Sequence, residues 1–408
     1  MNQSNKKVFK LLGKVQHYAW GGISFIPQLL HIENHENKPF AEYWLGAHDH
    51  ASSELVMDHE EGIMLNEYIQ SDAAATLGEY VNNRFRRLPY LLKILDVKDM
   101  LSIQVHPSKE NAENEFSQEN KKSIPLHAPY RNYKDDNHKP ELMLALGEFW
   151  LLHGFKPKEK LIKILHEIPE LNFLLPVFEK GNYYELYKTV MELDQDIVNE
   201  VLEPLLARIV PRYLKNEFKK GDENFWAARA AMTYNEPGKI DRGIFSVYLF
   251  NLVHLDAGEA VFQDAGLPHA YLEGQNVEIM ANSDNVLRGG LTPKHIDVNE
   301  LLKHVKFEET IPTIIAGKEN SRHIHSYVTP AKDFELAGIA LPAEEKMAVT
   351  ADSVETFLVF AGSVVVTESE KPPLTITGGE AFVAFHKASL QIVAQKNTVI
   401  YRASVPPR

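Results

Sequence analysis

Two short segments carry side chains that bind metal ions, at spacings that would bring them together. In the run SIQVHP, Gln104 and His106 are separated by one residue. Successive side chains of a β-strand point to opposite faces, so both would project to the same side and could share one ion. In GEAVFQDAGLPHAY, which begins at Gly258, a strand pattern meets a glycine-punctuated turn that delivers His269. The pattern favours metal-assisted chemistry.

The composition limits which ligands such a metal has. The 408-residue chain contains no cysteine, which excludes disulfides, thiolate zinc sites, iron–sulfur clusters and cysteine nucleophiles. Its 56 acidic and 43 basic residues give a formal net charge of −13. That balance argues against nucleic-acid or anionic-membrane partners, and an anionic ligand would need a local basic pocket.

The segments around the first metal-binding run look rich in strands. Residues 1–155 hold short apolar runs, such as 89–95, 101–105 and 142–155, which are broken by polar loops. Runs of this length are typical of a β-sandwich or barrel. Residues 107–140 are polar throughout, and we interpret them as a long insertion or lid.

The hydrophobic period changes after residue 156. Apolar residues between Val198 and Ile209 recur at helical spacing, and Pro204 within that pattern should kink or interrupt the helix. Further helices are predicted over 158–166, 184–193 and 223–234. We therefore expect a helical domain over residues 156–250.

Strand character returns at Leu252 and continues to residue 408. Three runs, 357–366, 374–385 and 390–401, suit a second, small sandwich. A chain of this length predicts two or three domains. The N-terminal segment lacks a secretory leader, and no apolar run approaches the roughly 18–20 residues that span a bilayer, so we expect a soluble, cytoplasmic protein.

The second metal-binding segment resembles a motif of the cupin superfamily, with Asp264 in place of the usual proline between Gly258 and Gly266. Gln104-x-His106 stands where the family has His-x-His. The resemblance implies that the glutamate of this motif is Glu141, displaced by the insertion, and that Zn²⁺, one per chain, is bound by a set of four ligands. These are Gln104, His106, Glu141 and His269. Taken singly, each of the chain's 18 histidines is more often a surface or core residue than a ligand.

Longer motifs narrow the resemblance. QVHP, HKPE from His138, GLPHAY from Gly266 and NVLRGGLTPK from Asn285 are together similar to the type I mannose-6-phosphate isomerase family, as are HYAWG from His17 and EYWLG from Glu42. The resemblance implies a mainly β fold with a helical insertion: two cupin-like jelly-roll β-sandwich domains plus an α-helical domain. The catalytic, metal-binding domain would comprise 1–155 and 251–315, and 316–408 would form the second cupin-like domain.

The same resemblance implies an activity, the interconversion of D-mannose 6-phosphate and D-fructose 6-phosphate by proton transfer through a cis-enediol. Arg288 would be the main catalytic residue. Proton transfer is assigned to no single group in the family, and the candidates are Lys139, His138, Glu278 and Asp284. The substrate-binding positions would be Ser102, Lys93, Tyr271 and Lys294.

Such residues suit this chemistry, because isomerisation needs an electrophile for the developing oxyanion, a base, and cations for the phosphate. Lys93 lies in the apolar run PYLLKIL, which favours a functional role. Lys294 and Asp284 have polar neighbours and suit a solvated surface nearly as well. Glu278 alternates with apolar residues and is compatible with the outward face of a strand.

The C-terminal domain offers an internal comparison. When Gly379 is aligned with Gly258, the ligand position falls on Leu390, so we expect no metal site there. Two other functions are considered: an iron-dependent cupin oxygenase, and a non-enzymatic sugar sensor. The amide ligand Gln104 and the cations Arg288 and Lys294 favour a small phosphosugar over both. The sequence leaves the oligomeric state open and is compatible with a monomer.

Overall fold

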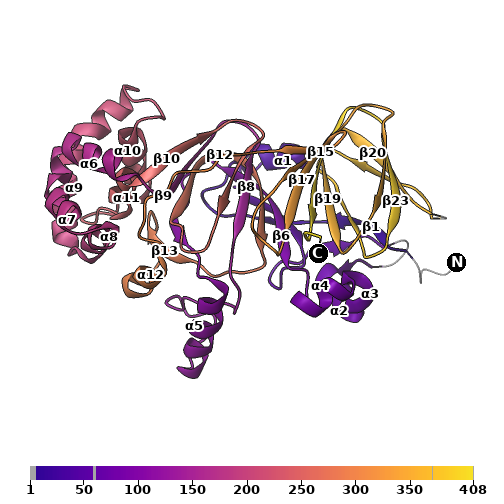
Figure 1. Cartoon of the computed structure of the whole chain (residues 1–408). Coiled ribbons are helices and arrows are strands. Elements are labelled where there is room, and N and C mark those ends of the chain that lie inside the picture. Colours follow the sequence, from indigo (N-terminus) through magenta and orange to yellow (C-terminus); the bar gives the residue numbers. More distant parts are fainter. Residues whose placement is uncertain (1–5, 58–60, 370, 408) are drawn as a thin grey trace.

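The computed structural model describes residues 6–57, 61–369 and 371–407. The molecule is elongated, with helices at one end, a large sheet in the middle and the C-terminal strands at the other end (Figure 1). Within those described ranges, no helix is both long and apolar enough to cross a membrane.

The central sheet is built around one long strand, β12 (His269–Ala281). All its pairings are antiparallel, and β12 contacts different neighbours along its length. The main path of the sheet is β14 (Ile315–Ala316), β11 (Glu259–Gln263), β8 (Glu141–Ala145), β12, β6 (Tyr90–Val97), β3 (Glu42–Gly46) and β2 (Lys14–Gln16). The start of β12 pairs instead with β7 (Ile103–Val105) and β9 (Phe149–Phe155), which are followed by β13 (Leu287–Gly290) and β10 (Phe250–Leu255).

Both faces of this sheet are buried, which explains the continuous apolar runs in the sequence. On β6, Leu92 and Ile94 pack into a core that also contains Leu358 and Val383 of the C-terminal strands. The alternating residues Leu91, Lys93 and Leu95 face the other side. A lysine on a fully buried strand therefore points into the interior rather than to solvent.

A second sheet of nine strands lies at the C-terminal end. Its order is β15 (Lys318–Ser321), β16 (Ile324–Tyr327), β17 (Glu335–Leu341), β24 (Thr398–Ser404), β19 (Glu355–Ala361), β22 (Ala381–Ala384), β1 (Val8–Leu12), β4 (Glu54–Leu55) and β5 (Ile63–Met64). A four-stranded sheet faces it, with the order β18 (Lys346–Thr350), β23 (Ser389–Ala394), β20 (Ser363–Glu368) and β21 (Leu374–Thr377).

This arrangement differs from the expected division of the chain in one respect. Residues 1–155 were assigned to the catalytic part, but β1, β4 and β5 continue the C-terminal sheet. Leu11 pairs with Ala381 of β22 on one side and Leu55 of β4 on the other. The N-terminal strand thereby covers what would be an open edge of the sheet.

The three C-terminal apolar runs each form two strands rather than one. The run 357–366 turns at Gly362, whose φ of +88° is a conformation that favours glycine. A side chain there would meet the backbone oxygen of Asn397. Periodicity alone predicted the strand character of these runs but not the turns within them.

Helices occupy the range in which we expected a helical domain. They are α6 (Lys158–Glu167), a 3₁₀ helix (Pro169–Leu174), α7 (Leu175–Lys180), α8 (Tyr183–Glu192), α9 (Gln195–Leu214), α10 (Glu223–Tyr234) and α11 (Gly243–Leu249). We expected a kink or an interruption at Pro204. The interruption is wrong, because α9 continues through Pro204 and through Pro211. Burial of Leu202, Leu205 and Ile209 holds the helix together across the proline.

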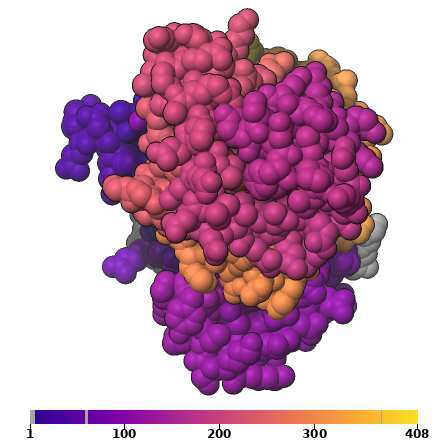
Figure 2. All heavy atoms as spheres, turned by 90° about the vertical axis from the view of Figure 1, so that its left-hand side faces the viewer, coloured from indigo at the N-terminus to yellow at the C-terminus, as the bar shows by residue number. Residues whose placement is uncertain are grey.

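Six further helices lie outside this domain in the described parts of the chain, α12 (Val298–His304) among them, and none was predicted from the sequence. Within the polar segment 107–140, α5 (Lys109–Lys121) projects from the body of the molecule. The others are α1 (Phe25–Leu29), α2 (Leu65–Ser71), α3 (Ala73–Leu77) and α4 (Glu79–Phe85). After α5, the chain is anchored by Tyr133, whose hydroxyl donates to Glu300 of α12 (Val298–His304). Figure 2 views the molecule from the helical end. The orange segment around α12 lies there between the helices of residues 158–249 and the insertion 107–140.

Tyr90 connects the two large sheets, which leads to a prediction about stability. Its buried hydroxyl lies 3.0 Å from the carbonyl oxygens of both Val354 and Ala403. Tyr90→Phe leaves these groups without that partner, so it should lower the free energy of unfolding by about 1–3 kcal/mol. Chemical denaturation followed by circular dichroism measures the change. Tyr130→Phe, at a side chain that is 54% exposed, serves as the control and should be neutral; equal stability of the two variants would contradict the assignment.

Candidate functional site

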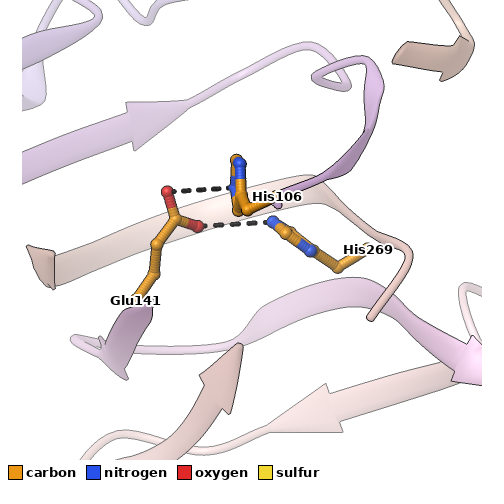
Figure 3. Close-up of side chains that lie close together, drawn as sticks. All are labelled: His106, Glu141 and His269. Atoms are coloured by element: carbon orange, nitrogen blue, oxygen red, sulfur yellow. Dashed lines mark ion pairs between the residues drawn. The ribbon is translucent and has the colours of Figure 1, made fainter. Parts of the chain in front are cut away.

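Three buried side chains meet at the start of the long strand. Ligand atoms of His106, Glu141 and His269 all lie within 4.8 Å of one another. The Nε2 atom of His106 is 3.4 Å from Oε1 of Glu141, and the Nε2 atom of His269 is 3.3 Å from Oε2 (Figure 3). The carboxylate thus presents one oxygen to each imidazole.

The backbone explains why residues so far apart in sequence meet here. His269 begins β12, Glu141 begins β8, and His106 directly follows β7. The amide of Gly266 donates to the carbonyl of His106, which ties the turn before His269 to the end of β7. Gly266 has a φ of +80°, and a side chain there would meet the His304 carbonyl. Glycine is therefore required at position 266, because the backbone segments of Gly266 and His304 approach each other closely.

The hydrogen bonds of the two imidazoles fix their tautomers. Nδ1 of His106 is 2.8 Å from the Asn285 carbonyl, and Nδ1 of His269 is 2.9 Å from the Leu267 carbonyl. A carbonyl oxygen only accepts, so each Nδ1 carries a proton and each Nε2 presents a lone pair to the carboxylate. This is the orientation of metal-binding histidines, whose other nitrogen donates to a carbonyl.

The donor set fits a divalent cation. Nε2 of His106 is buried and has no hydrogen-bond partner among the described residues. Burial also lowers the pKa of this imidazole to about 4, so it is neutral near pH 7. Two imidazole nitrogens and a carboxylate that point at one another are satisfied by a cation between them. Nitrogen and oxygen donors of this kind suit Zn²⁺.

Strand register places Gln104 and Arg288 beside this cluster. His269 pairs with Gln104, and Gln104 pairs with Arg288 on β13. Directly opposed residues of antiparallel strands point to the same face, so the three side chains form a row. His153 extends the row on the other side of His269. The sequence predicted Gln104 and His106 on one face, but only the sheet order places Arg288 next to them.

A cavity of about 640 Å³ lies in front of the cluster, and a smaller one of about 50 Å³ reaches the metal-binding groups. Predicted residues that line the larger cavity are Lys93, Ser102, Gln104, Lys139, Asp284, Arg288 and Lys294. Those that line the smaller one are Lys93, Gln104, Lys139, Glu141, His269, Tyr271 and Glu278. Since Lys93, Gln104 and Lys139 line both, the two spaces are adjacent. Of the thirteen predicted site residues, only His106 and His138 line neither.

The floor of the cavities is a network of buried charges. Nζ of Lys93 lies 2.9 Å from Oε2 of Glu278 and 3.5 Å from Oε2 of Glu42. The hydroxyl of Tyr271 donates to Oε1 of Glu278 at 2.9 Å. Burial raises the pKa of the Glu278 carboxyl, although the charge of Lys93 opposes this. Glu278 is therefore a buried carboxylate fixed by two donors, not the outward face of a strand.

Glu42 is a further candidate for the site. From the sequence it was recognised only as the first residue of the motif EYWLG. It is buried, accepts a hydrogen bond from the Trp44 indole and lines both cavities. The signal available in the sequence was an acidic residue that opens the strand EYWLG. Nothing in that run shows that Lys93 of β6 lies beside it.

Lys139 and Arg288 bring positive charge to the cavities. Nζ of Lys139 lies 3.2 Å from Oε1 of Glu141. Burial raises the pKa of Glu141, but the charge of Lys139 opposes this, and the pKa lies well below its usual range. Arg288 has no ion-pair partner in the described parts of the chain, and its burial lowers its pKa. The alternative that Arg288 pairs with Asp284 is therefore not observed.

Two candidates for proton transfer lie elsewhere or are engaged by other groups. His138 points away from the cavities, with Nε2 3.0 Å from Oδ2 of Asp333. Asp284 lies at the rim, 3.3 Å from Nε2 of His48 and 3.7 Å from Nε2 of His50. Burial raises the pKa of Asp284, but the hydrogen bond and charge of His48 lower it to about 2. Such a carboxylate is a weak base near pH 7.

Together, the strand order and the cluster define a sheet-rich protein with a divalent-metal site beneath a basic cavity. Residues 8–158 match the family model "Phosphomannose isomerase type I, catalytic domain". The chain is 35% identical to mannose-6-phosphate isomerase of Salmonella typhimurium, over 92% of this chain and 94% of that one. The human enzyme is 31% identical over 97% and 98% of the two chains.

Solved structures agree with the sequence comparisons. A zinc-bound crystal structure of mannose 6-phosphate isomerase superposes with a TM-score of 0.86 at 32% identity, covering 98% of this chain and 100% of that one. The Salmonella typhimurium enzyme bound to fructose 6-phosphate and zinc gives 0.86 at 33% identity, with the same coverage. The chain belongs to the type I mannose-6-phosphate isomerase family.

The cluster leads to a prediction about metal content. His269→Ala removes one imidazole from a site that has few donors, so the protein should lose its stoichiometric zinc and its turnover together. Elemental analysis of the purified variant measures the loss. His166→Ala, at an exposed position of α6, is the matched control and should retain the metal. Full zinc content in the His269 variant would remove this residue from the ligand set.

Proposed function

We propose that this chain is a zinc-dependent aldose–ketose isomerase that interconverts D-mannose 6-phosphate and D-fructose 6-phosphate. The observation that carries the proposal is the row formed by His269, Gln104 and Arg288. It leads from the candidate metal site to a cation that has no ion-pair partner among the described residues and that lines the larger cavity. Relatives of similar length are named for this reaction, and the Salmonella typhimurium structure contains fructose 6-phosphate and zinc.

His106, Glu141 and His269 would hold the metal, with the amide oxygen of Gln104 as the fourth ligand. Gln104 lies beside His269 and lines both cavities, which supports this assignment. When bound, Zn²⁺ acts as a Lewis acid that stabilises negative charge on the substrate oxygen at C1 or C2. Arg288 adds a fixed positive charge from the neighbouring strand, where burial strengthens its effect.

Substrate binding uses the groups at the cavity wall. The exposed Lys294 follows β13 and offers charge to a dianionic phosphate, and Ser102 offers a hydroxyl. Lys93 contributes differently from our expectation, because it is already engaged with Glu278 and Glu42. We assign Lys93 and Tyr271 to positioning Glu278 rather than to direct phosphate contact.

Proton transfer falls to the groups near the smaller cavity. Of the four candidates, Lys139 and Glu278 line it, whereas His138 and Asp284 do not. We assign the base to Glu278, because burial raises its pKa and makes its carboxylate a better proton acceptor. It would take the proton from C2 of the aldose and return it to C1 of the cis-enediol. Lys139, which contacts Glu141, would stabilise the oxyanion beside it.

The architecture supports the domain assignment given by the resemblance. The central sheet and the C-terminal pair of sheets would be two cupin-like jelly rolls, with β1, β4 and β5 completing the second one. Leu390 is buried on β23 at the position that corresponds to a ligand. The second unit would therefore support the first without binding a metal, and the protein would act in the cytoplasm.

Metal removal tests the function directly. Chelation should abolish turnover of mannose 6-phosphate in an assay coupled to fructose 6-phosphate, and added Zn²⁺ should restore it. The metal-free protein should also melt at a lower temperature, since a ligand that binds only the folded state stabilises it. Undiminished turnover without metal would contradict the mechanism, and consumption of O₂ by the metal-loaded protein would favour the oxygenase alternative.

Arg288 provides a second test. A partner that acts mainly in the transition state lowers kcat more than it raises KM when it is removed. Arg288→Lys should reduce kcat by a factor on the order of 10²–10³, because an ammonium group does not reproduce the planar guanidinium contact. Steady-state kinetics and zinc analysis on the same preparation measure this.

The control for Arg288 is Arg322→Lys, at an exposed position of the C-terminal part. Both variants should retain zinc and melt near the wild-type temperature. A near wild-type kcat in Arg288→Lys, or a loss confined to thermal stability, would contradict a catalytic role for Arg288.

A further inference from the structure

A second large cavity lies behind the wall of the first. It encloses about 440 Å³ and is lined by residues from four parts of the chain. These are the end of α4 and the residues after it, the start of α5 together with the segment before β8, the end of β11, and the loop before β17. None of its residues lines the 640 Å³ cavity in front of the metal-binding cluster. We call that cavity the front cavity and this one the rear cavity.

The wall between the two cavities is the segment HKPE. Neighbouring residues of an extended chain point to opposite sides, and this segment follows that rule. Lys139 points forward to Glu141, whereas His138 points back to Asp333 in the rear cavity. Pro140 also lines the rear cavity, and its carbonyl accepts a hydrogen bond from Ala281 at the end of β12.

The rear cavity has an excess of unpaired positive charge. Four Lys or Arg side chains line it, against two carboxylates. Both carboxylates already have partners, because Asp264 lies 3.0 Å from Lys306 and Asp333 contacts His138. Of the four cations, Lys109 pairs with Glu113, and within the described ranges no ion pair involves the other three, Arg84, Arg87 and Lys332. In a chain with a net charge of −13, such a concentration of free cations is a local exception.

The remaining lining is apolar. Phe85, Pro89, Pro140, Phe262 and Pro330 contribute carbon surface beside the charged groups. A cavity that combines carbon surface with a few convergent charged groups suits a small organic anion better than bulk solvent ions. Arginine and lysine together favour phosphate, to which guanidinium groups bind with two parallel hydrogen bonds.

We propose that this rear cavity binds a small phosphate-bearing molecule at a site distinct from the isomerase centre. Arg84, Arg87 and Lys332 bind the phosphate, and the apolar lining contacts the organic part where there is one. The ligand lies against His138, one residue away from Lys139, so the two sites share a wall without sharing a binding group.

Isothermal titration of the zinc-loaded protein tests the proposal with two probes, inorganic phosphate and phenyl phosphate. The titrations use an Arg288→Ala/Lys294→Ala background, in which the two cations of the front cavity that have no carboxylate partner among the described residues are removed, while Lys93 and Lys139 stay paired with Glu278 and Glu141. In that background, Arg84→Glu/Lys332→Glu should weaken phosphate binding at least tenfold. Both altered side chains are exposed, so the fold should be retained, and the melting temperature checks this.

The matched control is Lys318→Glu/Lys346→Glu, which makes the same change in charge at exposed positions of β15 and β18. It should leave phosphate affinity within about twofold of the background, since distant surface charges are screened by salt. Tighter binding of phenyl phosphate identifies an organic phosphate as the ligand, and equal affinity identifies free phosphate. Equal weakening by the control, or no weakening by Arg84→Glu/Lys332→Glu, overturns the proposal.

Discussion

The site depends on an electrostatic requirement that the protein alone does not satisfy. Backbone carbonyls hold the protons of His106 and His269 on Nδ1, so both Nε2 lone pairs face the carboxylate of Glu141 in a buried space. Lone pairs and a negative charge at this separation repel, and burial prevents water from relieving the repulsion. A divalent cation converts the same geometry into a binding site. The tautomers, the burial and the proposed chemistry therefore follow from one arrangement.

The long strand β12 makes this arrangement possible. Its first residue, His269, belongs to the candidate metal site, and its second half carries Glu278 between the neighbouring strands β6 and β8. Because one strand holds both groups, the spacing between the metal-binding cluster and the proposed base is set by the backbone rather than by loops. Sites on strands are held more precisely than sites on loops. The second sheet supports this strand from behind through the core that contains Leu358 and Val383.

Buried charge is distributed in compensating pairs throughout the front cavity. Lys93 is held by Glu278 and Glu42, and Lys139 by Glu141. Such pairs are costly to desolvate, and they contribute orientation more than stability. Arg288 differs from them because no carboxylate in the described chain neutralises it, which leaves its charge available to a substrate. This contrast separates the groups that build the cavity from the group proposed to act on its contents.

The sequence alone indicated which residue types could bind a metal, a sheet-rich class of fold and a run of helices after residue 156. It did so because these depend on local properties: the alternation that places Gln104 and His106 on one face, the Gly266 turn before His269, and the 3.6-residue period near Val198. The resemblance to one family rested on short motifs as well, among them QVHP and GLPHAY. Both kinds of signal are carried by residues close together in the chain.

Only the tertiary structure decided which distant residues meet. The register of β7 with β13 places Arg288 beside Gln104, and the pairing of β3 with β6 brings Glu42 to Lys93. The direction of His138 was equally hidden, since a shift of one residue moves a side chain to the opposite face of the wall. Likewise, β1 joined the C-terminal sheet because an open edge there had to be covered. These outcomes depend on pairing between segments far apart in the chain, and local residue patterns carry no information about such pairing.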